Sequence, residues 1–447
     1  MNLKSCYQLL RHGRLPGQLI IQLTDRCNAA CPQCGMNIRE RYPRKSLLLD
    51  DVRRMIDAAA RQGVQALSFT GGEPLLERAD LIALIRHAGA AGIPYIRTGT
   101  NGFCFRSPDK PDFEKRVHQL ADELASTPLR NFWISIDSAD PETHANMRGF
   151  RDVMRGIERA LPIFHTRGLY PSANLGINRN MGGPGSIPYL APTARGGLGV
   201  PEDIFRQCLQ NALARFFRFA AEIGFSIANV CYPMSVDGGG GPGDLQAVYG
   251  ATATSSIVAF TDREKALLFD ALALSVAEHR SRLRIFTPLC SLLALKRQFN
   301  GGQKGYACRG GRDFFFVDAQ KGHTYPCGYR GEEDLGVFGC EAAPSSSRGG
   351  DCHACEWECF RDPSELAGPL LEVAGNPFAS LRRLRTDPVL FRRWVGDLRY
   401  YRDCDFFDGR RPARLERLKR HSTSAALPEK DPAAQSLSIS SDPITTA

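Results

Sequence analysis

The first half of the chain alternates short apolar runs with longer amphipathic stretches of helical periodicity. The predicted strands cover 18–23, 64–69, 95–98, 131–137, 172–177 and 226–231, and the predicted helices cover 50–61, 75–91, 112–125, 150–167 and 202–223. Repeated strand–helix units indicate a parallel sheet with right-handed crossovers. Six strands are fewer than the eight of a closed barrel, so we expect an open or partial barrel with ligands at the C-terminal strand ends.

This alternation fades beyond residue 261. A helix over 262–280 leads into a cysteine-bearing α+β region with short strands such as 313–317. Two Gly-rich segments interrupt the pattern: 181–201, for which a lid and plain disorder are both open, and the hinge 238–243. We therefore expect an N-terminal extension (1–17), a barrel (18–237), a linker (238–260), a cysteine-rich region (261–420) and a disordered tail (421–447).

The composition is that of an ordinary globular protein except in cysteine. Of the 447 residues 43% are hydrophobic and 23% charged, and no apolar run reaches the length of a membrane span. The N-terminus lacks the apolar core and cleavage site of a signal peptide, so we expect a cytoplasmic location. In such a reducing compartment, fifteen cysteines indicate metal or redox chemistry before disulfides.

The net charge of +9 comes largely from arginines and a lysine late in the chain. They are Arg382, Arg383, Arg385, Arg392, Arg393, Arg410, Arg411, Arg414, Arg417, Lys419 and Arg420. Charge runs usually form a solvated helical face, and this is the reading that we favour. Nucleic acid and anionic lipid headgroups are the alternative partners for such a cluster.

Three cysteines follow the first predicted strand directly. Cys27, Cys31 and Cys34 are separated by three residues and then by two. Three thiolates from one tight loop can hold three irons of a cubane [4Fe–4S] cluster and leave the fourth iron without a protein ligand. Catalytic metal sites keep such an open position. A structural zinc with His12 as a further ligand is the alternative at this point.

The cysteine spacing resembles the CxxxCxxC motif of the radical S-adenosylmethionine (SAM) superfamily. Further strand ends carry elements similar to the family's GGEP, TNG, SxD and RG: Gly71 to Pro74, Thr100 to Gly102, Ser135 to Asp137, and Met147 to Gly149. The resemblance implies an α/β fold, a partial (β/α)6 radical SAM barrel with a cysteine-rich α+β C-terminal extension. One departure is Gln33, which stands where the family usually has an aromatic residue.

The resemblance also implies roles for individual residues. A [4Fe–4S] cluster on Cys27, Cys31 and Cys34 would bind S-adenosylmethionine. The cofactor-binding residues implied are Gly71, Gly72, Glu73 and Pro74 at the methionine ammonium group, Asn101, Ser135 and Asp137 at the ribose hydroxyls, Arg148 at the methionine carboxylate, and Asn178 or Asn180 facing the same pocket.

A second cysteine set lies in the second half of the chain. It comprises Cys308, Cys327, Cys340, Cys352, Cys355, Cys359 and Cys404, and it partly resembles the SPASM or twitch extension, which carries auxiliary iron–sulfur clusters. Four thiols complete one cubane, so we expect one auxiliary cluster; two clusters that also use Cys290, or a zinc site, are the alternatives. Cys6, Cys104, Cys208 and Cys231 lack ligand spacing and are predicted to be small buried thiols.

The function implied by the resemblance is that of a radical SAM enzyme. It cleaves S-adenosylmethionine reductively to a 5′-deoxyadenosyl radical, which abstracts hydrogen from a peptide or small-molecule substrate. A one-electron reductant such as flavodoxin or ferredoxin is the expected protein partner, and nucleic acid is not. Two alternatives are an iron–sulfur electron carrier or sensor without turnover and a zinc-stapled nucleic-acid-binding protein, for which aromatic residues should be interleaved with the late arginines.

Overall fold

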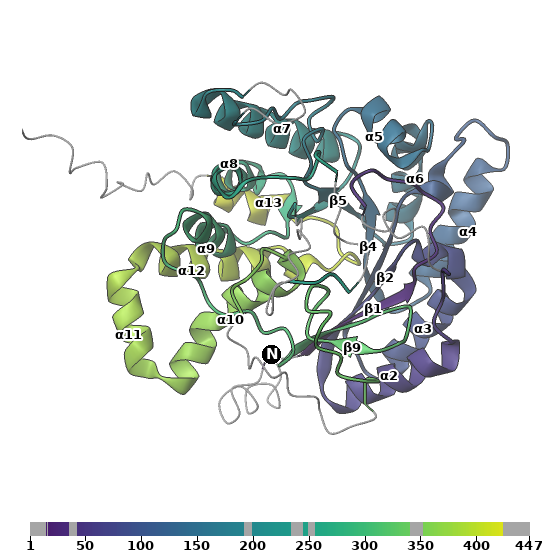
Figure 1. The fold of residues 1–447 in the computed structure, drawn as a ribbon. Coiled ribbons are helices and arrows are strands. Elements are labelled where there is room, and N and C mark those ends of the chain that lie inside the picture. Colours follow the sequence, from purple (N-terminus) through teal and green to yellow (C-terminus); the bar gives the residue numbers. More distant parts are fainter. Residues whose placement is uncertain are drawn as a thin grey trace, which may run out of the picture.

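The computed structural model describes residues 15, 17–34, 43–191, 199–233, 245–248, 255–339 and 352–422. In this part of the chain, one open nine-stranded sheet organises the molecule (Figure 1). Its strands are β1 (Gly17–Thr24), β2 (Val64–Gly71), β3 (Tyr95–Thr100), β4 (Leu129–Ser135), β5 (Ser172–Gly176), β6 (Ile227–Cys231), β7 (Arg284–Ile285), β8 (Phe314–Val317) and β9 (Thr324–Tyr325). The α/β class and the partial barrel predicted from the sequence are therefore confirmed.

The sheet order is β7-β6-β5-β4-β3-β2-β1-β8-β9. Neighbours from β7 through β1 to β8 are parallel, and β9 runs antiparallel to β8. The first six strands are those that the sequence predicts. The second half of the chain adds β7 beyond β6 and the β8–β9 pair beside β1, so it extends the sheet at both edges.

Helices cover one face of this sheet (Figure 1). Residues 262–299 of the second half pack into the same core as the first-half helices, whereas Phe314, Phe316 and Phe360 pack with Ile20 on the other face. The first-half helices are α2 (Leu49–Arg61), α3 (Arg78–Ala90), α4 (Phe113–Ala125), α5 (Pro141–Arg148), α6 (Val153–Thr166) and α7 (Glu202–Glu222). The second-half helices are α8 (Asp262–His279), α9 (Leu289–Phe299), α10 (Glu358–Gly375), α11 (Pro377–Thr386), α12 (Pro388–Asp403) and α13 (Leu415–Leu418). None of the helices in the described ranges is both long and apolar enough to cross a membrane.

Strand β1 shows how side chains are divided between the two faces. Leu19, Ile21 and Leu23 are buried in the main core with the helices. Ile20 points the other way and packs with Phe314 and other residues of the second half. Side chains along a strand therefore alternate with a period of two. Every second side chain points into the barrel, where the functional groups gather.

The helix predicted over 150–167 is shorter than expected, and a separate helix, α5, precedes it. Gly149 ends α5 in the left-handed region (φ 75°), and Asp152 before α6 has φ 57°. Two such residues break the helical path, so α5 and α6 are distinct. Similarly, the helix predicted over 75–91 begins as a 3-10 turn, Pro74–Glu77, before α3.

The first eleven residues of the Gly-rich segment 181–201 are packed rather than loose. Met181 and Ile187 are buried in the main core. At the base of the segment, buried Arg179 pairs with Glu264 of α8 at 2.9 Å, and the Leu190 amide donates to the same carboxylate at 2.9 Å. Residues 192–198 of this segment, the hinge 238–243 and the tail beyond 422 lie outside the described residues.

Candidate functional site

The three-cysteine loop leaves the C-terminal end of β1. Cys31 is buried, Cys34 is half-buried and Cys27 is exposed, and all three are free thiols. The Cys34 amide donates to the Cys31 carbonyl at 3.0 Å, which closes the turn between them. Burial raises the pKa of Cys31 to about 12; the Arg148 guanidinium opposes this rise, while Cys34 and Cys27 add to it. The thiols therefore lie within electrostatic reach of one another and of Arg148.

The two glycines of the Gly71–Pro74 motif pack against this loop. A Cβ on Gly71 would lie 2.2 Å from the Thr24 carbonyl oxygen, and one on Gly72 would lie 2.2 Å from the Arg26 carbonyl oxygen. The Gly72 amide donates to Thr24 O at 2.7 Å, and the Glu73 amide donates to Arg26 O at 2.8 Å. Glycine is needed here because the chain's own backbone approaches so closely.

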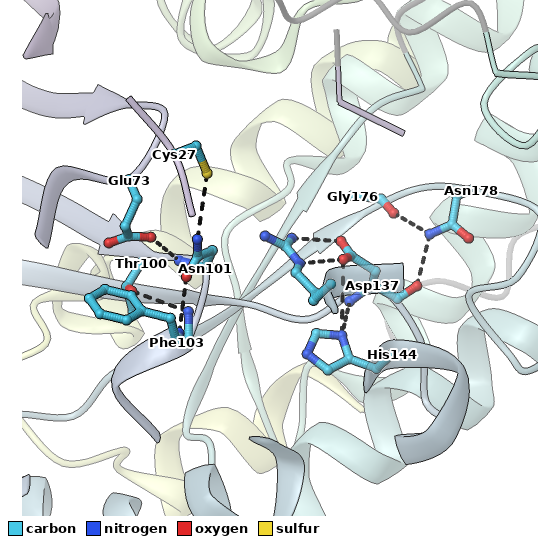
Figure 2. Close-up of polar contacts among 11 residues, drawn as sticks. Cys27, Glu73, Thr100, Asn101, Phe103, Asp137, His144, Gly176 and Asn178 are labelled. Carbon is cyan, nitrogen blue, oxygen red and sulfur yellow. Dashed lines mark hydrogen bonds and ion pairs between the residues drawn. The ribbon is translucent and has the colours of Figure 1, made fainter. Parts of the chain in front are cut away.

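Glu73 ties the ends of β2 and β3 together. The carboxylate is fully buried and accepts a hydrogen bond from the Leu75 amide at 3.0 Å. It also accepts one from the Asn101 amide at 2.6 Å (Figure 2). Burial raises the pKa of Glu73 to about 7, and these hydrogen bonds act against the rise. Its role at a methionine ammonium group stays a prediction, since in the structure both oxygens are engaged by backbone amides. Pro74 follows as the buried first residue of the 3-10 turn.

Asn101 at the end of β3 reaches the cysteine loop. Its side-chain amide donates to Asn28 Oδ1 at 2.9 Å. The same nitrogen lies 3.6 Å from Cys27 Sγ (Figure 2). Its own Oδ1 accepts from the Phe103 amide at 3.0 Å. The third strand end therefore meets the first, as the motif order in the sequence predicts.

Asp137, which is buried, and Arg148, which is half-buried, form a bidentate ion pair beyond the end of β4. Arg148 Nε lies 2.5 Å from Asp137 Oδ2, and Arg148 Nη2 lies 2.8 Å from Oδ1. Burial acts to lower the pKa of Arg148, but Asp137, Cys31 and Cys34 outweigh it, so the pKa is raised. The pair therefore neutralises charge beside the cysteine loop.

His144 and Asn178 fix the backbone around Asp137 (Figure 2). His144 Nδ1 accepts from the Asp137 amide at 3.0 Å, and burial lowers the pKa of His144 to about 4. Asn178 donates to Asp137 O and to Gly176 O, both at 2.8 Å. Ser135 ends β4, half-buried, in register with Asn174 of β5. The sequence offered no signal for His144, because a lone histidine on a helix has no motif spacing.

A cavity of about 170 Å³ lies inside the barrel. Residues from β1 to β6 line it, together with Trp357, Glu358 and Cys359 at the start of α10 and with Phe286 and Phe316. Its polar groups include the side-chain amides of Asn131, Asn174 and Asn229. Arg97 is the one cation among the lining residues that the structure describes, and it donates to Ser68 Oγ at 2.5 Å.

The second cysteine set separates in space. Four of its members come together, namely Cys308, Cys327, Cys352 and Cys355. The Cys308 amide donates to Cys352 O at 2.8 Å. Burial is the largest cause that raises the pKa of Cys355, and the nearby thiols of Cys327, Cys308 and Cys352 raise it further. Burial and the neighbouring Cys308 and Cys352 likewise raise the pKa of Cys327. We refer to these four residues as the cysteine quartet.

The quartet's sulfurs have the environment that cluster ligands require. Each of three sulfurs accepts a hydrogen bond from the backbone amide two residues downstream. The Gly310 amide donates to Cys308 Sγ at 3.5 Å, and the Tyr329 amide donates to Cys327 Sγ at 3.4 Å. The Trp357 amide donates to the sulfur of Cys355. Hydrogen bonds of this kind stabilise a thiolate and tune an iron–sulfur centre. The residues present therefore fit a four-thiolate cluster.

Two cysteines predicted as auxiliary ligands lie elsewhere, and a third is outside the described residues. Cys404 packs with Tyr400 and Ile227 in a separate hydrophobic cluster. Cys359 lines the barrel cavity opposite Cys231, and Cys340 falls in a range that the structure does not describe. Their assignment as ligands stays a prediction.

Cys231 and Cys359 meet around a buried carboxyl group. Cys359 Sγ donates to Glu358 Oε1 at 3.5 Å, and Glu358 also hydrogen-bonds Cys231. Asn174 Nδ2 lies 3.3 Å from Cys231 Sγ. Burial raises the pKa of both thiols and of Glu358. The sequence predicted Cys231 only as a small buried thiol and did not connect it with Cys359.

In the described ranges, no three His, Cys, Asp or Glu side chains are gathered closely enough to ligate one metal ion. A cubane cluster does not need such a grouping, because each cysteine binds a different iron. Three free thiols on one loop fit a cluster with one iron left open.

Residues 21–170 match the family model described as the Radical SAM superfamily. The GTP 3′,8-cyclase of Rhizobium etli (strain CIAT 652) is 31% identical over 155 residues, which are 33% of this chain and 41% of the relative. The PqqA peptide cyclase of Xanthomonas campestris pv. campestris (strain B100) is 29% identical over 165 residues, 37% of this chain and 40% of the relative. The chain thus spans about two fifths of the length of these curated relatives.

Among solved structures, Streptococcus suis SuiB bound to S-adenosylmethionine aligns with a TM-score of 0.47 and 17% identity, covering 72% of this chain and 63% of SuiB. The matched residues 21–170 contain the three-cysteine loop, the Gly71–Pro74 motif, Asn101 and the Asp137–Arg148 pair. The match to the Radical SAM superfamily model therefore covers the same stretch of the chain that carries these motifs.

Proposed function

We propose that this protein is a radical SAM enzyme. Cys27, Cys31 and Cys34 hold a [4Fe–4S] cluster, and S-adenosylmethionine binds beside it at the C-terminal ends of β1 to β5. When bound, such a cluster supplies the single electron that breaks the C5′–S bond and leaves a 5′-deoxyadenosyl radical. Methionine would be the other product of that cleavage, and a peptide or small-molecule substrate held in the barrel cavity would give a hydrogen atom to the radical.

The observation that carries this proposal is the meeting of four separate motifs at one edge of the sheet. Glu73 joins the second strand end to the third, Asn101 joins the third to the cysteine loop, and Arg148 lies within electrostatic reach of Cys31. Chance occurrences of short motifs would not converge in this way. Ligands of parallel α/β sheets bind at the carboxyl ends of the strands, which is where these groups lie.

The chain's own residues have three tasks in this function. Arg148 and Asp137 supply a charged donor and an acceptor beside the cysteine loop for the carboxylate and ribose of S-adenosylmethionine. Gly71 and Gly72 hold the second strand end against that loop. The second half of the chain, with Trp357 at the start of α10, covers the cavity and limits the access of water to a reactive radical.

A single auxiliary cluster on the cysteine quartet completes the proposal. Four thiolates satisfy the four irons of a cubane, so the quartet needs neither Cys359 nor Cys404. A one-electron reductant such as flavodoxin or ferredoxin is the proposed partner. A cytoplasmic location suits both clusters, because free thiols persist in a reducing compartment.

The cavity also indicates the substrate class. The names of the two relatives point to two kinds of substrate, GTP and a peptide. A triphosphate carries several negative charges, whereas Arg97 is the one cation among the described residues that line the cavity. The amides of Asn131, Asn174 and Asn229 can instead pair with peptide groups. We therefore propose a peptide or another substrate without a polyphosphate; micromolar affinity for GTP in calorimetry would refute this choice.

The test is anaerobic reconstitution followed by assays of iron, sulfide and 5′-deoxyadenosine under a strong reductant. Wild type should hold about eight irons, four for each cubane. Changing Cys27, Cys31 and Cys34 together to Ala should remove about four irons and all S-adenosylmethionine cleavage. Changing the whole quartet to Ala should also remove about four irons. As the control, Cys208→Ala on α7 should retain the full iron content and activity.

Other iron contents would decide against parts of the proposal. About twelve irons would mean two auxiliary clusters and would bring Cys290, Cys340, Cys359 and Cys404 in as ligands. Zinc without sulfide, together with no 5′-deoxyadenosine, would refute the radical enzyme. A full iron content without any cleavage of S-adenosylmethionine would favour an electron carrier or sensor.

A further inference from the structure

Helix α11 (Pro377–Thr386) carries its large apolar side chains on the outside of the molecule. Phe378 is 83% exposed, Leu381 48% and Leu384 39%. Ser380 is the one buried residue of this helix. A helix in a globular protein ordinarily turns its apolar stripe toward the core, and here the stripe faces solvent. Figure 1 places α11 at the outer edge of the arc formed by α10, α11 and α12.

The exposure is concentrated in this arc. Of the 13 large hydrophobic side chains that are exposed in the described residues, six lie on α10 to α12. They are Leu370, Val373, Phe378, Leu381, Leu384 and Leu398. Singly exposed hydrophobic residues are ordinary, but a group of them on neighbouring helices marks an interaction surface.

Two arginines share the exposed side of α11. Arg382 and Arg385 follow Phe378 by four and seven residues, and Leu381 follows it by three, so helical spacing puts all four on one face. Neither Arg382 nor Arg385 forms an ion pair with any residue that the structure describes. Arg383 points elsewhere: it pairs with Glu372 at 3.1 Å and lies over the Tyr306 ring. Leu384 is exposed one turn beyond Leu381, beside this face. We call Phe378, Leu381, Arg382 and Arg385, together with the adjoining Leu384, the α11 face.

The exposed side of α11 carries cationic groups without acidic ones. Helix α11 contains no Asp or Glu. The aspartates that flank and follow it, Asp387, Asp397 and Asp403, are buried and pair with Arg297, Arg280 and His421. The exposed side of α11 therefore offers apolar and cationic groups together, with no acidic group among them.

We propose that the α11 face docks on an anionic lipid surface. Phe378, Leu381 and Leu384 enter the boundary between headgroups and acyl chains, while Arg382 and Arg385 contact lipid phosphates. A basic helix with Phe and Leu on its buried side lies in the plane of a membrane interface, and arginine stems extend along apolar surface to reach the headgroups. A convex helix at the outer edge of the molecule can reach a flat bilayer, whereas a peptide partner calls for a groove.

The experiment is flotation of the full-length protein with large unilamellar vesicles. Vesicles of phosphatidylcholine with phosphatidylglycerol should bind wild type, and vesicles of phosphatidylcholine alone should bind it weakly. Replacing Arg382 and Arg385 by Gln should weaken binding to the anionic vesicles about 30-fold at low salt, since each basic residue near such a surface contributes about fivefold. Phe378→Ser should weaken it about tenfold. Added salt should weaken wild-type binding in the same direction as the arginine changes.

A matched control removes the same charge elsewhere. Arg61 and Arg86 are exposed on α2 and α3, so the double change to Gln lowers the net charge equally without touching the α11 face. This control should bind vesicles within about twofold of wild type if position matters more than net charge. A 30-fold loss in the control would overturn the proposal, because binding would then follow total charge alone.

Insertion can be observed directly with Phe378→Trp. Brominated lipids should quench the new tryptophan and leave the three native tryptophans of wild type unquenched. Two other occupants would overturn the proposal. The first is an acidic peptide, which would be shown if the protein bound a Glu- and Leu-rich helix tightly and did not bind vesicles. The second is another copy of this chain, which would be shown by a dimer that Phe378→Ser abolishes. Cleavage of S-adenosylmethionine in solution should be unchanged in every variant, so the result does not depend on the proposed activity.

Discussion

The ion pair of Asp137 and Arg148 makes a strong prediction about stability. Arg148→Gln leaves the Asp137 carboxylate, which is 1% exposed, without the two guanidinium contacts of 2.5 and 2.8 Å. Removing one partner of a buried pair costs about 3–5 kcal/mol, because the other charge stays buried and uncompensated. For a chain of 447 residues this corresponds to a melting temperature lower by about 3–5 °C.

A double-mutant cycle separates the pair from the two single residues. Arg148→Gln, Asp137→Asn and the double variant are compared by thermal unfolding monitored by circular dichroism. The double variant should lose less than the sum of the two single losses, since no unpaired charge remains. Arg53→Gln breaks the exposed pair of Arg53 and Asp50, 3.0 Å apart, and should change the free energy of unfolding by less than about 1 kcal/mol.

The reasoning would be refuted if Arg148→Gln melted like the Arg53→Gln control. Arg148 would then be unpaired in the absence of ligand and free to serve S-adenosylmethionine alone. The stabilisation by added S-adenosylmethionine gives an independent reading, because a ligand that binds only the folded state raises the melting temperature. Arg148→Gln should lose this rise, and Arg53→Gln should keep it.

Three further predictions concern the same region and the cysteines. Gly72→Ala places a Cβ 2.2 Å from a carbonyl oxygen of the cysteine loop, so reconstituted protein should hold fewer irons by colorimetric assay. The folded-state pKa values of Glu73 (raised to about 7) and His144 (lowered to about 4) have opposite effects on stability. In urea titrations, the stability of Glu73→Gln relative to wild type should rise with pH between about 4.5 and 7, and that of His144→Asn relative to wild type should fall with pH between about 4 and 6.5; parallel profiles would contradict both shifts. Cys355→Ser should cost about four irons and Cys359→Ser none, and equal losses would return Cys359 to the auxiliary site.

The first six strands were predictable from the sequence because each is a run of five to eight residues bounded by turns. Such runs carry a hydrophobic signal that is independent of the rest of the fold. The order of motifs along the chain then placed Cys27, Glu73, Asn101 and Asp137 at one edge, since parallel strands end together. These contacts follow from local sequence plus one topological rule.

Strands β7 and β9 were not predictable in this way. Each has only two residues, Arg284–Ile285 and Thr324–Tyr325. Segments this short have no periodicity of their own, and they become strands because β6 and β8 offer unpaired edges. Their existence depends on the tertiary structure, which the sequence pattern does not contain.

The division of the second cysteine set has a similar origin. The spacing CxxCxxxC places Cys352, Cys355 and Cys359 close together in the chain. Helix α10 begins at Glu358, however, so Cys359 lies in its first turn while the other two precede it. The first turn faces the barrel cavity, and the preceding loop faces Cys308. Spacing alone cannot reveal where a helix begins relative to a ligand.

The roles that the motifs imply for Asp137 and Arg148 are compatible with their pairing. A guanidinium has five N–H donors, and Asp137 takes two of those of Arg148. Three donors are left for a methionine carboxylate, and the Asp137 oxygens retain lone pairs for ribose hydroxyls. The pair holds both side chains in place before a ligand arrives, so less conformational entropy is lost on binding. A motif that treats the two residues as separate ligand contacts therefore omits the interaction that positions them.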